Sequence, residues 1–172
     1  MSMDDDLGTS RLLLHAMSVT DAEHVVAGSA PAGVRWALGY PSPGDKGAAM
    51  RFLTTCEGVG DPSPFGLYEI RLREDGAVIG GVGFHRAPDE RGSVTIGYGL
   101  VESARGKGYA SEALRALLRF ARDQGVAQVL GDADADNIAS QRVMAAAGMR
   151  LVAEDASVKY YLVDWGDDDG DE

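Results

Sequence analysis

A glycine-rich turn joins a strand-like run to a strongly amphipathic helical run in the middle of the chain. Residues 94–101 form the strand-like run, and residues 105–110 form the turn. The apolar residues that follow recur at the spacing of one buried helical stripe: Ala110, Ala113, Leu114, Leu117, Leu118 and Ala121. This spacing predicts a helix over Tyr109–Asp123. Gly125 then ends the helix, and residues 126–130 predict a parallel strand reached by a helical crossover, which indicates an α/β fold.

The turn also has the chemistry of an anion-binding site. The first turn of a helix presents backbone N–H groups without partners, and the helix dipole adds partial positive charge there. Gly106 and Gly108 lack the Cβ atoms that keep an anion away from the backbone, and they tolerate positive φ angles. Arg105 and Lys107 add two full positive charges. We therefore expect the turn to bind a pyrophosphate group.

Two well-known phosphate loops fit the turn poorly. A Walker A loop needs a glycine five residues before Gly106 and a Ser or Thr after the lysine, but Val101 and Gly108 stand there. A dinucleotide fingerprint counted from Gly106 meets Ser111 where a third glycine belongs, and no acidic residue follows at the expected distance. The turn is therefore not a Walker A loop, and it is a weak dinucleotide motif.

The turn resembles motif A of the GNAT acyl-CoA N-acetyltransferases, written Arg/Gln-x-x-Gly-x-Gly/Ala, which Arg105, Gly108 and Ala110 satisfy. The branch that is similar to the ribosomal-protein N-terminal (alanine/serine) acetyltransferases adds an N-x-x-S … G-F/M signature. The residues that match this signature are Asn137, Ser140, Gly148 and Met149. Residues 9–14 and 20–23 also match that branch, so the resemblance extends from about residue 9 to residue 165.

The resemblance implies a GNAT fold: a mixed, mostly antiparallel central sheet with a parallel, splayed strand pair, flanked by helices. Strand patterns over residues 11–16, 65–73, 77–86, 93–101, 149–153 and 157–163 agree with such a sheet. Helices are expected over residues 20–26, with Thr20 as a candidate N-cap, over 45–57 and over 137–147. The implied activity is acetyl-CoA-dependent transfer of an acetyl group to a primary amine, on a protein or a small molecule, by direct attack.

The resemblance also implies a set of residues that bind acetyl-CoA as co-substrate: Leu100, Val101, Arg105, Gly106, Lys107, Gly108, Tyr109, Ala110, Asn137 and Ser140. Leu100 and Val101 are expected to contribute backbone groups, one of them as an oxyanion donor. Asn137 is expected to bind the pantetheine arm, and Ser140 is the candidate general acid for the leaving thiolate. Both have plain structural alternatives, because Asn137 fits a helix N-cap and Ser140 can bond a carbonyl one turn back. Met144 stands where many relatives have a tyrosine acid.

The acceptor side and the general base are less defined. Trp36, Tyr40, Phe84 and His85 are expected to line the acceptor site, although large aromatic residues are more often part of a core. The base stays open among Glu69, Glu102, His85 and water. An α-amine, with a pKa near 7.8, needs little help, since keeping it neutral at pH 7 costs about 1 kcal/mol, whereas a lysine costs more than about 4 kcal/mol.

The strand expected over residues 93–101 has one unusually bare face, which carries Gly97 and Gly99 at alternate positions. Either a ligand or a bulky core side chain packs close to the backbone there.

Charge and length favour a single domain over residues 9–165 between two acidic tails, 1–8 and 166–172, which are expected to be disordered. The formal charge of −11 comes mostly from the tails: outside residues 4–6 and 167–172, 19 acidic residues face 16 basic ones.

Cys56 is the only cysteine, the amino terminus is acidic, and no apolar run reaches membrane-spanning length, which favours a cytoplasmic protein.

The expected partners are acetyl-CoA and an amine, with a homodimer implied by the family and with neither nucleic acid nor membrane. His15, His24 and His85 lack metal-ligand spacing, so no metal is expected. The competing function is a non-catalytic CoA-binding sensor or interaction module on the same fold.

Overall fold

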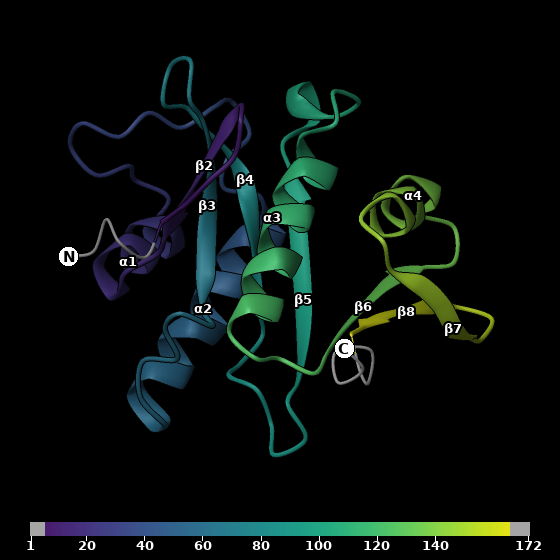
Figure 1. The fold of residues 1–172 in the computed structure, drawn as a ribbon. Helices are drawn as coiled ribbons and strands as arrows, with labels where there is room; N and C mark the ends of the chain where they lie inside the picture. The colour runs from purple at the N-terminus through teal and green to yellow at the C-terminus, as the bar shows by residue number, and fades with distance from the viewer. Residues whose placement is uncertain (1–5, 166–172) are drawn as a thin grey trace.

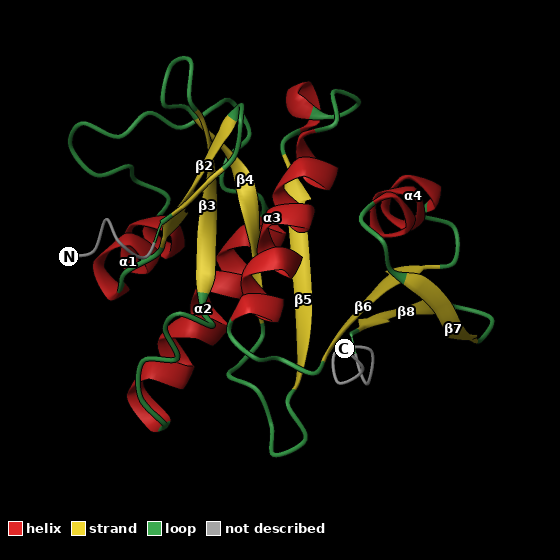
Figure 2. Cartoon of the chain, in the orientation of Figure 1, coloured by secondary structure: helices red, strands yellow, loops and turns green. Residues whose placement is uncertain are grey.

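The computed structural model describes residues 6–165, which form one eight-stranded sheet flanked by helices (Figures 1 and 2). Its strands run in the spatial order β1-β2-β3-β4-β5-β6-β8-β7. Their bounds are β1 Leu7–Gly8, β2 Leu12–Ala16, β3 Leu67–Leu72, β4 Val78–Phe84, β5 Ser93–Leu100, β6 Gln128–Asp134, β7 Arg150–Glu154 and β8 Val158–Asp164. All neighbouring strands are antiparallel except β5 and β6, which are parallel. The expected mixed, mostly antiparallel sheet is confirmed.

The parallel pair separates along its length. The register of β5 and β6 holds only from Ser93 opposite Gln128 to Thr95 opposite Leu130. Beyond Thr95, β5 continues beside β4 alone, while β6, β8 and β7 turn away (Figure 1). The carboxyl-terminal half of β5 therefore has a free edge, at the place where open α/β sheets bind ligands.

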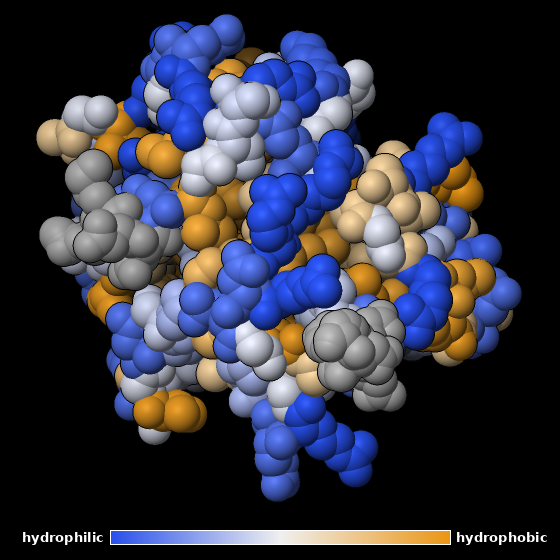
Figure 3. Space-filling view, viewed as in Figure 1, coloured by the Kyte–Doolittle hydropathy of each residue, from blue (hydrophilic) through white to orange (hydrophobic). Residues whose placement is uncertain are grey.

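In the described part of the chain, four α-helices cover the sheet: α1 (Val19–Ala27), α2 (Pro43–Gly58), α3 (Tyr109–Asp123) and α4 (Ile138–Ala146). In Figure 1, α3 lies in front of the sheet and α2 behind it, while α4 covers the strands that diverge. Helix α3 has the predicted bounds and buries the predicted stripe from Ala113 onward, including Leu114 and Leu117 at 0% exposure, while Ala110 is only partly buried. Its outer face carries exposed Arg115, Arg119 and Arg122. Figure 3 shows hydrophilic side chains gathered over α3 on this face of the molecule.

The start of α1 differs from the expected N-cap. The Asp21 amide donates to the Ser18 hydroxyl at 3.0 Å, and the Asp21 carboxylate accepts from the Ser18 amide at 3.0 Å, so Ser18 and not Thr20 caps the helix. The reciprocal pair is a capping box, which satisfies two backbone donors at once.

Strand β6 also extends to Asp134, beyond the expected end at Leu130, because it pairs with β8 over its whole length.

The expected disorder of residues 1–8 is wrong for the residues that the structure describes. Leu7 and Gly8 form β1 opposite Leu14 and Leu13, and the Asp6 carboxylate accepts from the Ala16 amide at 2.8 Å. The pairing with β2 and the partial burial of Leu7 against the core order this segment. Residues 1–5 and the acidic tail 166–172 lie outside the described residues. No helix within residues 6–165 is long and apolar enough to cross a membrane.

Candidate functional site

A hollow of about 580 Å³ opens over the first turn of α3, and we call it the loop hollow. Its floor is the glycine turn, where Gly106 has a φ of 77° and Gly108 a φ of 85°. Gly108 is the N-cap residue of α3, and no side chain caps the helix. The amides of Tyr109, Ala110 and Ser111, which line the hollow, therefore have no side-chain acceptor. An anion can take that place.

The loop hollow suits a phosphate-bearing ligand in shape and in charge. No heavy atom lies within 4 Å of the position that a Gly106 Cβ would occupy, so the backbone is open there. Arg105 and Arg142 both line the hollow. Arg105 Nε donates to the Leu100 carbonyl at 3.1 Å, which fixes the arginine at the end of β5. Arg142, on α4, was not identified from the sequence, because only the fold brings α4 to the turn.

Two of the sequence-predicted residues are not brought to the loop hollow. Lys107 does not line it, and Lys107 Nζ instead donates to the Ser103 carbonyl at 3.3 Å. Val101 is 5% exposed, and its amide already donates to the Ile79 carbonyl at 2.9 Å. Alternate amides of a strand point in opposite directions, so the Leu100 amide faces the free edge of β5. Leu100, which lines the hollow, is thus the better-placed backbone donor of the two.

Asn137 and Ser140 lie on the far wall of the loop hollow, at the start of α4. The Asn137 side chain accepts from the Ser140 amide at 3.1 Å, so the N-cap alternative for Asn137 is correct, although the residue also lines the hollow. Ser140 does not bond a carbonyl one turn back. Its hydroxyl instead lies 2.6 Å from the Tyr98 hydroxyl, which also lies 2.9 Å from the Ser140 carbonyl.

Tyr98 is the functional candidate that sequence reasoning missed. Met144, at the position of the family's tyrosine, is completely buried, and its sulfur lies 3.0 Å from the position of a Gly131 Cβ. The tyrosine hydroxyl comes instead from β5, across the gap between the diverging strands. Burial raises the pKa of the Tyr98 phenol above its ordinary value, while the hydrogen bond with Ser140 acts in the opposite direction. The phenol therefore holds its proton at neutral pH and can donate it.

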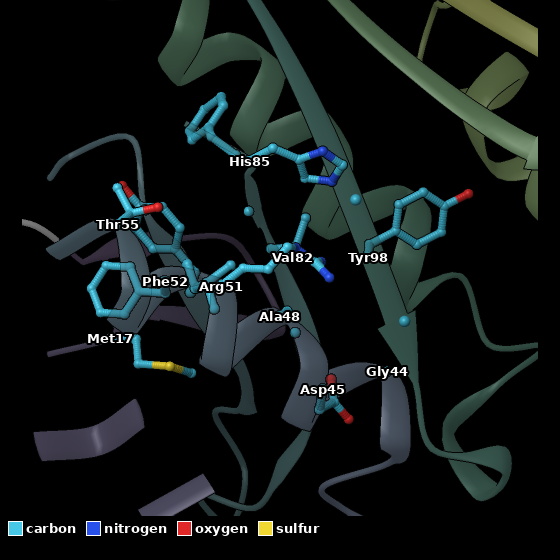
Figure 4. A pocket seen from close by; sticks show the side chains of 18 of the residues that line it. Met17, Gly44, Asp45, Ala48, Arg51, Phe52, Thr55, Val82, His85 and Tyr98 are labelled. Carbon is cyan, nitrogen blue, oxygen red and sulfur yellow. The ribbon is translucent and has the colours of Figure 1, made fainter. Parts of the chain in front are cut away.

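A second hollow of about 270 Å³ lies between α2 and the strands β4 and β5, and we call it the α2 hollow (Figure 4). Tyr98 and Gly99 line both hollows, so the two meet at this point of β5. Of the four residues expected on the acceptor side, Tyr40, Phe84 and His85 line the α2 hollow and Trp36 does not. The Trp36 ring packs edge-on against Tyr40 with 5.3 Å between ring centroids. Phe84 is 2% exposed, and its ring packs against Phe65 and Phe120.

The bare face of β5 forms part of the α2 hollow. His85 Nε2 lies 3.1 Å from the position of a Gly97 Cβ, so a polar ring covers that glycine. No heavy atom lies within 4 Å of the corresponding position on Gly99. The bare face therefore has no bulky core side chain over it. It is open where the two hollows meet, which favours the ligand alternative for Gly99.

Asp45 is the one acidic residue among those that line the two hollows. One oxygen, Oδ2, accepts from the Ser42 amide and from the Ser42 hydroxyl, both at 2.9 Å, in the capping box of α2. The other, Oδ1, lies 3.4 Å from the position of a Gly81 Cβ, and Gly81 pairs directly with Gly99. Burial raises the pKa of the Asp45 carboxyl above its ordinary value, against the hydrogen bonds from Ser42. The sequence marks Asp45 only as a helix-start residue, since its approach to Gly99 depends on the register of β4 and β5.

Of the three side chains considered as a base from the sequence, only His85 lines the α2 hollow. Glu69 is 2% exposed and bonds Arg71 Nη2 at 2.6 Å, which removes it from the hollow. Glu102 is exposed in the short 3-10 turn η2 (Glu102–Ala104) and lines neither hollow. Burial lowers the pKa of His85, and the charge of Arg51 lowers it further, so the imidazole is neutral at pH 7.

Within residues 6–165, no group of three or more metal-ligating side chains lies together.

Comparison with known proteins agrees with this architecture. The uncharacterized N-acetyltransferase YjdG of Bacillus subtilis (strain 168) is 30% identical over 99 residues, which are 57% of this chain and 59% of YjdG. The matched segment thus spans less than two thirds of that relative. A ribosomal-protein alanine acetyltransferase from Vibrio fischeri has the same fold, with a TM-score of 0.67, 14% identity, and coverage of 94% of this chain and 97% of that chain.

RimL, a ribosomal L7/L12 alpha-N-protein acetyltransferase solved in complex with coenzyme A, is a further structure of the same fold. Its TM-score is 0.65 at 20% identity, over 92% of this chain and 97% of that chain. Because both structures are less than 25% identical to this chain, they show only that the fold is shared. The family model of the acetyltransferase (GNAT) domain matches residues 11–150, which include β5, the glycine turn and α4. The chain therefore belongs to the GNAT acetyltransferase domain family.

Proposed function

We propose that this protein is an acetyl-CoA-dependent N-acetyltransferase that transfers an acetyl group to a primary amine by direct attack. The observation that carries the proposal is that the loop hollow and the α2 hollow meet at Tyr98 and Gly99. A two-substrate transfer needs two sites that open on one reacting centre. The free edge of β5 and the bare face of Gly99 supply such a centre.

The loop hollow is the proposed acetyl-CoA site. Bound there, acetyl-CoA supplies an acetyl group activated as a thioester. The uncapped amides at the start of α3 and the guanidinium groups of Arg105 and Arg142 would hold its phosphates. The Leu100 amide, directed to the free edge of β5, would donate to the thioester carbonyl oxygen and stabilise the negative charge that develops on it.

Tyr98 is the proposed general acid. When the C–S bond breaks, its phenol donates a proton to the departing sulfur, and the Ser140 hydroxyl then donates to the phenolate oxygen. The 2.6 Å contact between the two hydroxyls supports this role of Ser140, because its hydroxyl already lies where it can donate to the ionised phenol. Ser140, the acid candidate from the sequence, thereby becomes the residue that positions Tyr98.

Asp45 is the proposed base. The acceptor ammonium would first lose one proton to water, which leaves a neutral amine beside Oδ1. As that nitrogen forms the N–C bond, Asp45 would take the second proton that the nitrogen loses. A carboxyl whose pKa is raised by burial is a better proton acceptor than an exposed one. The acceptor that suits this base best is an α-amine, since a lysine would have to lose a far more tightly held proton.

A thiol-release assay tests the proposal. The purified protein is incubated with acetyl-CoA and a panel of primary amines, free CoA is followed by a thiol reagent, and the products are identified by mass spectrometry. We expect amine-dependent release of CoA and an acetylated amine, both strongly reduced by Asp45→Asn. If acetyl-CoA binds but no amine is acetylated, the protein is a CoA-binding module and the proposed activity is wrong.

A further inference from the structure

Groups of opposite charge line the α2 hollow. Its charged and imidazole-bearing residues are Asp45, Arg51 and His85 (Figure 4). Asp45 lies beside Gly81, which pairs with Gly99, whereas the His85 ring lies over Gly97. Gly97 and Gly99 are two residues apart on β5, which is about 6.6 Å. The hollow thus has a carboxylate near Gly81 and an imidazole over Gly97, and Arg51 adds a positive charge to the α2 wall.

Arg51 has no assigned partner in this arrangement. It forms no hydrogen bond or ion pair with another residue of the described chain, although it lines the hollow. Its Nη1 lies 3.8 Å from the position of a Gly47 Cβ, so the side chain folds back by about one helical turn toward Asp45. The guanidinium charge also lowers the pKa of the His85 imidazole.

We propose that the acceptor is an amine that carries a carboxylate a short distance from its nitrogen, as an α-amino acid or an acidic amino-terminal residue does. The inference rests on the proposed N-acetyltransferase function and adds the class of its substrate. The ammonium group contacts Asp45 beside Gly99, and the carboxylate contacts the Arg51 guanidinium, with the His85 ring as a further donor. An arginine matches the planar, two-oxygen geometry of a carboxylate, which makes it a specific partner.

The size of the hollow agrees with a compact acceptor. Its volume of about 270 Å³ lies just below the roughly 300 to 1,000 Å³ typical of sites for drug-sized ligands. Part of its wall is apolar and includes Met17 and Phe52. An amine without a carboxylate would leave Arg51 with no anion in the filled hollow, which costs binding energy.

Paired acceptors test the proposal. Each pair has the same amine with a carboxylate or with the matching carboxamide: a free amino acid against its amide, and a peptide that begins with Asp or Glu against one that begins with Asn or Gln. The assay measures kcat/KM at saturating acetyl-CoA. We expect the carboxylate member of at least one pair to be favoured by roughly tenfold or more. The pair that shows the preference distinguishes a free amino acid from a peptide terminus.

The variant Arg51→Gln should abolish this preference, and Arg51→Glu should reverse it. Arg119→Gln is the matched control, because Arg119 is an exposed arginine on α3, which covers the opposite face of the sheet. Calorimetric binding of acetyl-CoA to each variant verifies that the fold is intact. Equal rates for carboxylates and carboxamides, or a preference that survives in Arg51→Gln, would overturn the substrate class while N-acetylation of other amines stands. No turnover with any amine would remove the proposed function and this inference together.

Discussion

The hydroxyl of Tyr98 offers the sharpest test of the chemistry at the site. Tyr98→Phe removes one oxygen and keeps the ring, so it deletes the contacts at 2.6 Å to the Ser140 hydroxyl and 2.9 Å to the Ser140 carbonyl. A net contribution of about 1 kcal/mol per hydrogen bond predicts a loss of about 1 to 2 kcal/mol in the free energy of unfolding. For a domain of this size, each kcal/mol lowers Tm by about 2 to 4 °C.

The effect on catalysis should be much larger than the effect on stability. A positioned general acid contributes roughly 10²- to 10⁴-fold to the rate, which is about 2.7 to 5.5 kcal/mol of activation free energy. We therefore expect kcat to fall by that factor in Tyr98→Phe, while the Kd for acetyl-CoA changes little, because the phosphates are held elsewhere. Stopped-flow release of free thiol at saturating acetyl-CoA and amine measures kcat, and calorimetry measures Kd.

Two further variants complete this test. Ser140→Ala keeps the phenol but removes its partner, so kcat should fall by only about tenfold. Tyr160→Phe deletes the hydroxyl of an exposed tyrosine on β8 that lines neither hollow, and it should behave as the wild type. A wild-type kcat in Tyr98→Phe, or a larger loss in Ser140→Ala than in Tyr98→Phe, would refute Tyr98 as the acid. The second result would return that role to Ser140.

Three other predictions concern the loop hollow and the fold. Gly106→Ala and Gly125→Ala each add a Cβ to a residue at positive φ in open space, so each should lower the free energy of unfolding by roughly 1 to 2 kcal/mol. Only Gly106→Ala should weaken acetyl-CoA binding, which calorimetry measures. Equal binding by both variants would contradict the anion site. Arg142→Ala should lower acetyl-CoA affinity roughly tenfold and make it less dependent on salt, as measured by titration at several ionic strengths; an unchanged salt dependence would place the phosphates elsewhere. The hydrogen bond to Asp21 raises the pKa of His15 despite partial burial, so the imidazolium stabilises the fold below about pH 6.5 and this stability is lost as the pH rises through the raised pKa. Thermal melts should show this loss in the wild type and a flatter profile in His15→Gln, and identical profiles would contradict it.

Local patterns in the sequence predicted most of the fold. Helix α3 was predicted to the residue, because a long apolar stripe ends at a glycine turn on one side and at Gly125 on the other. The end of β6 was missed, because Asp132 and Asp134 are exposed and polar, and only pairing with β8 keeps them in a strand. The N-cap of α1 was misplaced by two residues, because Ser18 and Thr20 are equally good caps until the Asp21 carboxylate selects one.

The candidate site was only partly accessible from the sequence. The glycine turn could be read directly, since backbone amides and glycines at a helix start define such a site locally. Tyr98 and Ser140 are 42 positions apart, and their contact exists only because β5 and β6 diverge and α4 covers the gap. Asp45 lies beside Gly81, and only the register of β4 and β5, which pairs Gly81 with Gly99, brings it near the proposed reacting centre. The direction of the Lys107 side chain was likewise unpredictable, because a long flexible chain can turn either way from a loop.

The central claim is that acetyl transfer takes place where the loop hollow meets the α2 hollow. A crystal structure of the protein with bound coenzyme A tests it most directly. The account predicts that the pyrophosphate lies on the amides of Tyr109, Ala110 and Ser111, and that the sulfur lies within hydrogen-bonding distance of the Tyr98 hydroxyl, facing Gly99. Coenzyme A bound outside the loop hollow, or bound there with its sulfur directed away from Tyr98 and Gly99, would contradict it.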